Sequence, residues 1–340
     1  MATIKDIADL ANVSVSTVSK ALNDSPEIGS RTSAKIKAIA RQLGYVPNSA
    51  AVALKRSASY HIGIIVPEIS SEFFSKLVQA IETTASKRGF KSVLCFSKES
   101  FMTEHQIIQN FCNGSVDGII ISMSKQTQQL RDYKHILSLI DHGIPVVMVD
   151  RTCDSIECEK VCINDFGASE HAVEHLIATG CKRPAFISTI PKTNVGKERK
   201  KGYRSAVQHK LYENNAKGWV LELNGYRNFE KELDAFIQEN AVDGILAANE
   251  LAAIKAMNVI KKKGLRIPED VSVIGFTDGQ LSQNSSPSLT TISQNADIMG
   301  AIALKRLLLQ ITREVPRQNN HHQTIVKHKL ILRESTKTIH

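Results

Sequence analysis

From His61 onward, short apolar segments alternate with helical patterns, and this alternation constrains the fold more than any other feature of the chain. Such alternation is typical of parallel strands in one sheet with helices on its faces. A first series of strands is predicted at 62–66, 92–96, 118–121 and 146–149, with helices near 72–88, 104–113 and 127–142. A second series of strands is predicted at 185–187, 220–223, 244–247 and 271–275, with helices near 166–179, 197–209, 229–239 and 250–263. We therefore expect an α/β body of two tandem parallel-sheet lobes.

Two tandem lobes of this kind place a cleft between the carboxyl ends of their sheets, where α/β folds usually bind ligands. Asp117-Gly118-Ile119-Ile120 and Asp243-Gly244-Ile245-Leu246 occupy corresponding places in the two halves. The body is expected over 61–340, with a first lobe at about 61–162 plus 293–322 and a second at about 163–292 plus 323–335. This organisation predicts a binding protein for a small molecule.

The first 25 residues have a different pattern, of two short amphipathic helices joined by a turn. Apolar residues recur at helical spacing in each of them: Ile4, Ile7, Ala8 and Ala11 in the first, and Val15, Val18, Ala21 and Leu22 in the second. Asn12-Val13-Ser14 breaks the first helix, Ser14 can cap the second, and Val13 can fill the angle between them. Two helices held crosswise by a short turn can place the second in a DNA major groove.

The polar face of the second helix carries Ser16, Thr17, Ser19 and Lys20, whose hydroxyl and ammonium groups can bond phosphate oxygens and base edges. Residues 1–60 contain eight Lys and Arg against four Asp and Glu, whereas the whole chain has a net charge of +9. This concentration of positive charge suits a polyanionic partner, although a solvated basic face is an alternative.

A third helix is predicted from Ser30 to about Leu43, with Ile36, Ile39, Ala40 and Leu43 as its apolar stripe. It completes a small headpiece expected over 1–46. The alanine-rich segment that follows, within a linker at 47–60, can be helical but is too short to be stable alone. We expect it to become ordered on a partner.

The remaining composition excludes several classes of protein. The N-terminus has no basic segment followed by an apolar run, and no apolar stretch is long enough to span a membrane, so we expect a cytoplasmic protein without membrane contacts. Cys153, Cys158 and Cys162 are spaced too irregularly to favour a metal site, and no cofactor is expected. The chain lacks the common motifs of hydrolases, nucleotide-binding loops and zinc proteases, which argues against an enzyme.

The residues also carry a family resemblance. Ile4-Lys5-Asp6-Ile7-Ala8, Val13-Ser14, Thr17-Val18-Ser19, Leu22-Asn23, Leu43-Gly44-Tyr45 and Pro47-Asn48 resemble the headpiece of the LacI/GalR transcription regulators. The resemblance continues through 267–276, 287–292 and 330–335 of the body. It implies a ligand-responsive, sequence-specific DNA-binding regulator of the periplasmic-binding-protein-like fold, acting as a homodimer on pseudo-palindromic double-stranded operator DNA. The default function is repression of genes of carbohydrate or sugar-acid metabolism.

The resemblance implies DNA contacts from both the headpiece and the linker. The expected DNA-binding residues are Thr3, Ser14, Val15, Ser16, Thr17, Ser19, Lys20, Asn23, Ala51, Leu54 and Lys55. Leu54 matches the leucine that the family inserts into the minor groove, which kinks a base step. Val15 can contact a thymine methyl group, and Lys20 can reach guanine O6 or N7.

The resemblance also implies a site for a sugar or sugar acid in the cleft. The expected effector-binding residues are Phe73, Phe74, Asp150, Arg199, Asn249, Thr277, Asp278 and Gln294. For the two phenylalanines, helix packing is an equally strong alternative, and Arg151 could pair with Asp150. Thr277 stands where many relatives have an aspartate, which makes the cleft less negative and favours an acidic effector. A sugar-binding protein without a role in regulation is the alternative function.

Overall fold

The computed structural model describes residues 2–45, 58–211, 219–312 and 322–338, in two compact units that divide between Ser59 and Tyr60. The first unit consists of α1 (Ile4–Ala11), α2 (Val15–Leu22) and α3 (Ser30–Gln42). Its small core is formed by apolar side chains of all three helices, namely Ile7, Ala8, Ala11, Val18, Ala21, Ile36 and Ala40. Val13 packs against this core from the turn, which confirms its predicted place between the helices.

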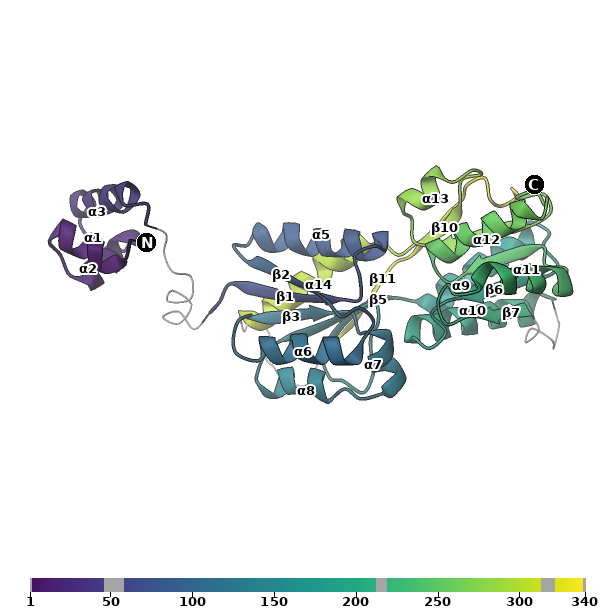
Figure 1. Ribbon diagram of the computed structural model, residues 1–340, viewed down its shortest axis with the longest axis horizontal. Helices are drawn as coiled ribbons and strands as arrows, with labels where there is room; N and C mark the ends of the chain where they lie inside the picture. The colour runs from purple at the N-terminus through teal and green to yellow at the C-terminus, as the bar shows by residue number, and fades with distance from the viewer. Residues whose placement is uncertain (1, 46–57, 212–218, 313–321, 339–340) are drawn as a thin grey trace. The chain divides into compact units, whose positions relative to one another are not determined.

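In the first lobe of the body, a parallel sheet has the strand order β11-β5-β4-β3-β1-β2. Its strands are β1 (His61–Val66), β2 (Lys91–Phe96), β3 (Gly118–Ile121), β4 (Val146–Val149), β5 (Glu159–Ile163) and β11 (Gln323–Val326). One face is covered by α5 (Glu72–Ser86) and α14 (Ala296–Ile311), and the other by α6 (Phe101–Phe111) and α8 (Lys134–Asp141), as Figure 1 shows. The short helix α7 (Lys125–Leu130) follows β3.

The second lobe repeats this arrangement, with the order β12-β10-β9-β8-β6-β7. Its strands are β6 (Pro184–Ser188), β7 (Val220–Glu222), β8 (Gly244–Ala247), β9 (Ser272–Phe276), β10 (Thr290–Ser293) and the antiparallel β12 (Lys329–Ile331). Its helices are α9 (Asp165–Ala178), α10 (Asn194–Leu211), α11 (Phe229–Asn240), α12 (Glu250–Lys262) and α13 (Gln280–Asn284). The two parallel sheets confirm the predicted fold class.

The structure corrects two details of the predicted body. The segment 323–335 was expected in the second lobe, but β11 pairs with β5 in the first sheet, and the chain joins the second sheet only at β12. The helix expected at 127–142 is divided into α7 and α8, because Arg131 has a left-handed φ of 55° that ends α7. The chain therefore passes between the lobes three times: after β5, after β10 and after β11.

Candidate functional site

The turn between α1 and α2 is built by local hydrogen bonds of the kind that the sequence predicts. Thr3 caps α1 in a reciprocal capping box with Asp6, whose pKa is lowered by the bonds from Thr3. Asn12 has a left-handed φ of 54° and ends α1. The Ser14 hydroxyl accepts a hydrogen bond from the Thr17 backbone N–H at 3.1 Å and caps α2, which confirms its predicted role.

The surface of α2 presents the side chains expected to contact DNA. Val15 is 41% exposed although it is apolar, and Ser16 beside it is exposed. Lys20 forms an ion pair with Glu27, and the Asn23 amide donates to the Ser19 carbonyl oxygen at 2.7 Å. Since exposed ion pairs contribute little to stability, Lys20 can exchange Glu27 for a base or phosphate. Ala51, Leu54 and Lys55, and with them most of the linker expected at 47–60, lie outside the described residues.

In the body, a close contact between α9 and α10 positions Arg199. A Cβ atom on Gly202 would lie 2.1 Å from the carbonyl oxygen of Phe166, so only glycine allows α10 to approach α9 this closely. The Ser169 hydroxyl donates to the Arg199 carbonyl oxygen at 2.6 Å and joins the two helices there. Arg199 consequently meets Asp165 in the first turn of α9.

The Arg199 guanidinium is buried, and each of its three nitrogen atoms contacts an acceptor of the protein. Its Nε and Nη2 atoms each lie 2.7 Å from Asp165 Oδ1, and Nη1 donates to the Ala248 carbonyl oxygen at 2.6 Å. Its Cζ atom lies 3.9 Å from the ring centroid of Phe276. Burial raises the pKa of Asp165, whereas the charge of Arg199 lowers it. Arg199 was predicted from the sequence as an effector-binding residue and Asp165 was not, although the place of Asp165 after Asn164 at a helix start was a usable signal.

A second group of predicted residues is joined by hydrogen bonds at the ends of three strands. Thr277 Oγ1 donates to Gln294 Oε1 at 3.0 Å, and Gln294 Nε2 donates to Asp150 Oδ1 at 3.4 Å. Asp150 and Thr277 have positive φ angles of 58° and 83°. Aspartate tolerates this backbone conformation, but for the β-branched Thr277 it is strained. Strained residues of this kind cluster at functional sites.

Asp150 is buried without a cation bonded to it in the described part of the chain. Burial raises its pKa to about 6, and the negative charge of Asp165 adds to that rise, although Arg199 and Arg151 oppose it. The alternative pairing with Arg151 was wrong, because Arg151 Nη1 instead donates to both carboxylate oxygens of Glu99, at 2.8 and 2.7 Å. Glu99 was not predicted from the sequence.

Asn249 lies at the end of β8 and caps α12 through a bond from the Ala252 N–H at 2.9 Å. Its amide also donates to Thr189 Oγ1 and its carbonyl oxygen accepts from the Tyr226 hydroxyl, both at 2.8 Å. Thr189 and Tyr226 were missed, because nothing in their local sequence distinguishes them. Asn249 is therefore held rigidly beside Ala248, the acceptor of Arg199.

A cavity of about 200 Å³ opens beside the predicted cleft residues. It is lined by Phe73 and Lys76 of α5, by Thr277 and Asp278 after β9, and by the segment between β10 and α14, namely Ser293, Gln294, Asn295, Ala296 and Asp297. The Asp278 carboxylate is bonded to Arg333, so it is not free for a ligand. Phe74 does not line this cavity and packs in the core, with Arg151 over its ring at 5.8 Å.

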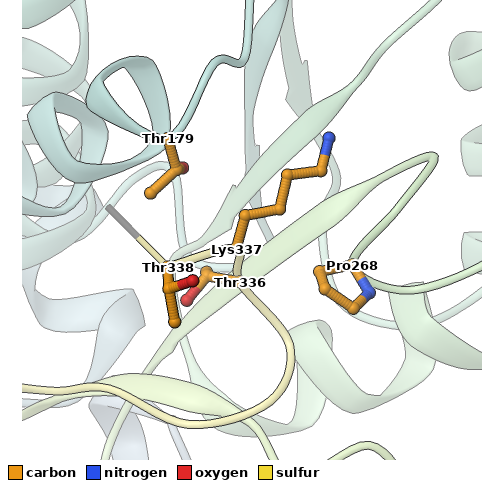
Figure 2. Close-up of a pocket in the computed structure, with 5 residues that line it drawn as sticks. All are labelled: Thr179, Pro268, Thr336, Lys337 and Thr338. Carbon is orange, nitrogen blue, oxygen red and sulfur yellow. The ribbon is translucent and has the colours of Figure 1, made fainter. Parts of the chain in front are cut away.

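A larger cavity, of about 390 Å³, contains none of the predicted site residues. Thr179, Pro268, Thr336, Lys337 and Thr338 line it, as Figure 2 shows. The Thr179 and Thr336 hydroxyls are already bonded to His175, by its carbonyl oxygen and by its ring Nε2 respectively. The other polar side chains in its lining are those of Lys337 and Thr338.

The cysteines and the helices add no further site. All six cysteines are free thiols, and burial raises the pKa of Cys158 to about 12 and that of Cys162 to about 11. Among the described residues, no three potential ligands are grouped as a metal site would require. In the same residues, no helix combines the length and the apolar character of a membrane span.

Comparison with known proteins finds a match for each of the two units. Residues 3–48 match the bacterial regulatory proteins of the lacI family, and residues 173–336 match the periplasmic binding protein-like domain. The ribose operon repressor of Halalkalibacterium halodurans is 30% identical over 99% of this chain and 98% of its own length. The probable HTH-type transcriptional repressor ExuR of Bacillus subtilis is 33% identical over 92% of each chain.

Solved structures agree with this assignment at the level of the fold. The Lac repressor dimer bound to operator and the anti-inducer ONPF superimposes with a TM-score of 0.86 over 99% of each chain, at 22% identity. The full-length sequence match and the matched headpiece cover both units of the molecule. The chain therefore belongs to the LacI family of bacterial transcriptional regulators.

Proposed function

We propose that this regulator is a homodimeric repressor of carbohydrate or sugar-acid metabolism genes, and that a sugar or sugar acid bound in the cleft sets its operator affinity. The observation that carries the proposal is the hydrogen-bonded set of Asp150, Gln294 and Thr277 at the carboxyl ends of three strands, together with the buried Arg199, which is bonded to Asp165 and Ala248. A relative named for the ribose operon supports the same effector class.

The proposed DNA contacts come from two segments. On the headpiece they are Thr3, the exposed side of α2 with Val15, Ser16 and Lys20, and Asn23. On the linker they are Ala51, Leu54 and Lys55, with Leu54 as the minor-groove wedge. Two copies are needed to occupy both halves of a pseudo-palindrome, because one headpiece presents one helix to the major groove.

In the cleft, the polar groups suit a ligand that both donates and accepts hydrogen bonds. Asp150 can accept from a sugar hydroxyl, and the Gln294 amide, whose bond to Asp150 is long at 3.4 Å, can turn toward a hydroxyl or a carboxylate. Asn249 presents its amide in a fixed orientation. Arg199 can clamp an effector oxygen if Asp165 yields one of its bonds, since a guanidinium carries five donors. Thr277 in place of a carboxylate favours an acidic effector. Effector binding then acts on operator affinity by preferring one arrangement of the lobes.

Two measurements test this proposal. A gel shift of DNA from the region upstream of the protein's own gene, competed by excess nonspecific DNA, should show a specific complex. Isothermal titration with neutral sugars, sugar acids and sugar phosphates should then identify a binder that changes the shift. Binding of neutral sugars alone would reject an acidic effector, and failure to shift any genomic fragment, with or without those compounds, would reject operator binding.

Sedimentation of the purified protein tests the assembly state. A homodimer predicts one species of twice the chain mass of 37.5 kDa at the concentrations used for the gel shift. A monomer that still binds a full pseudo-palindrome at the same concentration would contradict the proposed dimer.

A further inference from the structure

The short helix α7 makes direct contact between the two lobes. Gln128 Nε2 donates to Asn194 Oδ1 at 3.0 Å, and the Asn194 backbone N–H donates to Gln128 Oε1 at 2.8 Å. Gln128 belongs to the first lobe, and Asn194 is the first residue of α10 in the second. Gln128 is only 7% exposed, so this reciprocal pair is largely shielded from water.

A helix of six residues is not stable by itself, so other groups must hold α7 in place. The Ser124 hydroxyl caps it by accepting from the Thr127 N–H at 3.1 Å. The carboxylate of Glu104 in α6, which is fully buried, accepts from the Ser124 N–H at 2.6 Å and from the Thr127 hydroxyl at 2.5 Å. Glu104 thus fixes the first turn of the helix that carries Gln128.

A buried histidine completes the bonds of Glu104. His135 Nε2 lies 2.9 Å from Glu104 Oε1, and because a carboxylate accepts, the imidazole nitrogen is the donor. His135 Nδ1 is buried and has no hydrogen-bond partner among the described residues, so only the Nε2 bond fixes the ring by polar contact. Phe101 packs edge-on at 4.9 Å and His105 stacks at 5.8 Å, measured between ring centroids.

We propose that α7 is an interlobe latch, in which Gln128 and Asn194 form the contact and Glu104 and His135 are positioning residues. The two latch bonds form only when the lobes stand in the present arrangement, so they favour it over a more open one. An effector that prefers this arrangement binds more tightly while the latch is intact. The meaning for regulation rests on the proposed function, whereas the contact between Gln128 and Asn194 can be tested without DNA or an effector.

Hydrogen exchange at one amide tests the latch contact in the full-length, unliganded protein. The first N–H groups of a helix have no acceptor inside the helix, so the amide of Asn194 is protected by Gln128 Oε1. Gln128→Ala should raise the exchange rate of that amide at least tenfold. Gln129→Ala is the matched control on the exposed side of α7 and should leave it unchanged. An unchanged Asn194 amide in the Gln128→Ala protein would overturn the proposal.

The positioning role is tested by changing His135. His135→Leu removes the donor to Glu104 and should raise exchange at Asn194 about fivefold without raising it in β6. His135→Gln can place an amide donor near the position of Nε2 and should restore most of the protection. Faster exchange throughout the first lobe, with no selective effect at Asn194, would show a purely structural role and overturn the assignment.

A smaller substitution keeps the test decisive if His135→Leu does not fold. Thr127→Val preserves the shape of the side chain and removes its hydroxyl, with the bonds to Glu104 and to the Ser124 hydroxyl, so it should raise Asn194 exchange by about two- to fivefold. No change in this variant would equally count against the positioning role. These measurements use neither DNA nor a sugar, so a protein that binds neither could still show the latch.

Discussion

The exposed face of α2 and the cleft of the body hold their proposed binding side chains in opposite states. Val15 and Ser16 are exposed, and the ion pair of Lys20 lies at the surface. Arg199, Asp150 and Gln294 are buried, and each already has a partner within the protein. Arg199 is bonded to Asp165, and Gln294 donates a hydrogen bond to Asp150. A substitution on α2 should therefore change DNA binding alone, whereas one in the cleft should change folding as well as effector binding.

Removing Arg199 should have the largest effect. Arg199→Ala leaves the buried Asp165 without its cation, and the free energy of unfolding should fall by about 3 to 5 kcal/mol. Urea unfolding followed by circular dichroism measures this change. In the double variant Arg199→Ala with Asp165→Asn, no charge is left unpaired, so much of the stability should return while effector binding stays lost. If Arg199→Ala is as stable as the original protein, the expectation that substitutions in the cleft also change folding is wrong.

Replacing Asp150 should raise the free energy of unfolding instead of lowering it, and the size of this change should depend on pH. Because its pKa in the fold is about 6, above the ordinary 3.8, the folded protein holds this proton more strongly than the unfolded chain. The charged carboxylate therefore lowers stability increasingly as pH rises from about 4 to 6, and the full cost is present above that range.

Asp150→Asn should accordingly raise the free energy of unfolding by about 2 to 3 kcal/mol at pH 7.5 and have little effect at pH 4. Thermal or urea unfolding at several pH values measures the difference between the two proteins. The same variant should bind the effector less tightly, because it loses a strong acceptor. A difference in stability that does not vary with pH would contradict the assigned state of Asp150.

Replacing Lys20 on α2 tests whether a substitution on this exposed face changes DNA binding without changing stability. Lys20→Ala should weaken operator binding by about 1 to 3 kcal/mol if the side chain reads a guanine, while the free energy of unfolding stays within about 0.5 kcal/mol. Fluorescence anisotropy of labelled operator DNA measures the affinity. Glu27→Ala is the matched control, since it frees Lys20 and should not weaken binding. Equal loss of affinity in both variants would indicate that the ion pair itself is what DNA binding needs.

The smallest expected effect concerns the helix cap. Ser14→Ala removes the acceptor for the Thr17 N–H and should lower the stability of the first unit by about 1 kcal/mol. Ser16→Ala, on the exposed side of the same helix, should not change stability. Hydrogen exchange in α1 to α3 measures both. If Ser16→Ala lowers the stability of the first unit as much as Ser14→Ala does, the Ser16 side chain contributes to folding and is not available for DNA alone.

The sequence predicts the first unit almost completely because its determinants are local. Asn12, Ser14 and the apolar spacing act within a few residues, and the structure places them as expected. In the body, β1 to β4 and β6 to β9 were predicted, whereas β5, β10, β11 and β12 were not. The pairing of Asp165 with Arg199 and that of Glu99 with Arg151 could not be predicted, since the partners lie 34 and 52 residues apart along the chain and meet only in the folded body. The segment 323–335 was assigned to the wrong lobe at β11 for the same reason, because β11 pairs with β5, which lies far away in the sequence.

The last pass of the chain between the lobes has a consequence for how the molecule is made. The second sheet is complete only with β12, and Ser335 then bonds the Val273 carbonyl oxygen and the Thr290 N–H. A chain emerging from the ribosome supplies these residues after every residue of the first unit, which has its own core and can fold before they appear. The small unit that carries the helix-turn-helix can thus be folded while the second sheet of the body is still incomplete.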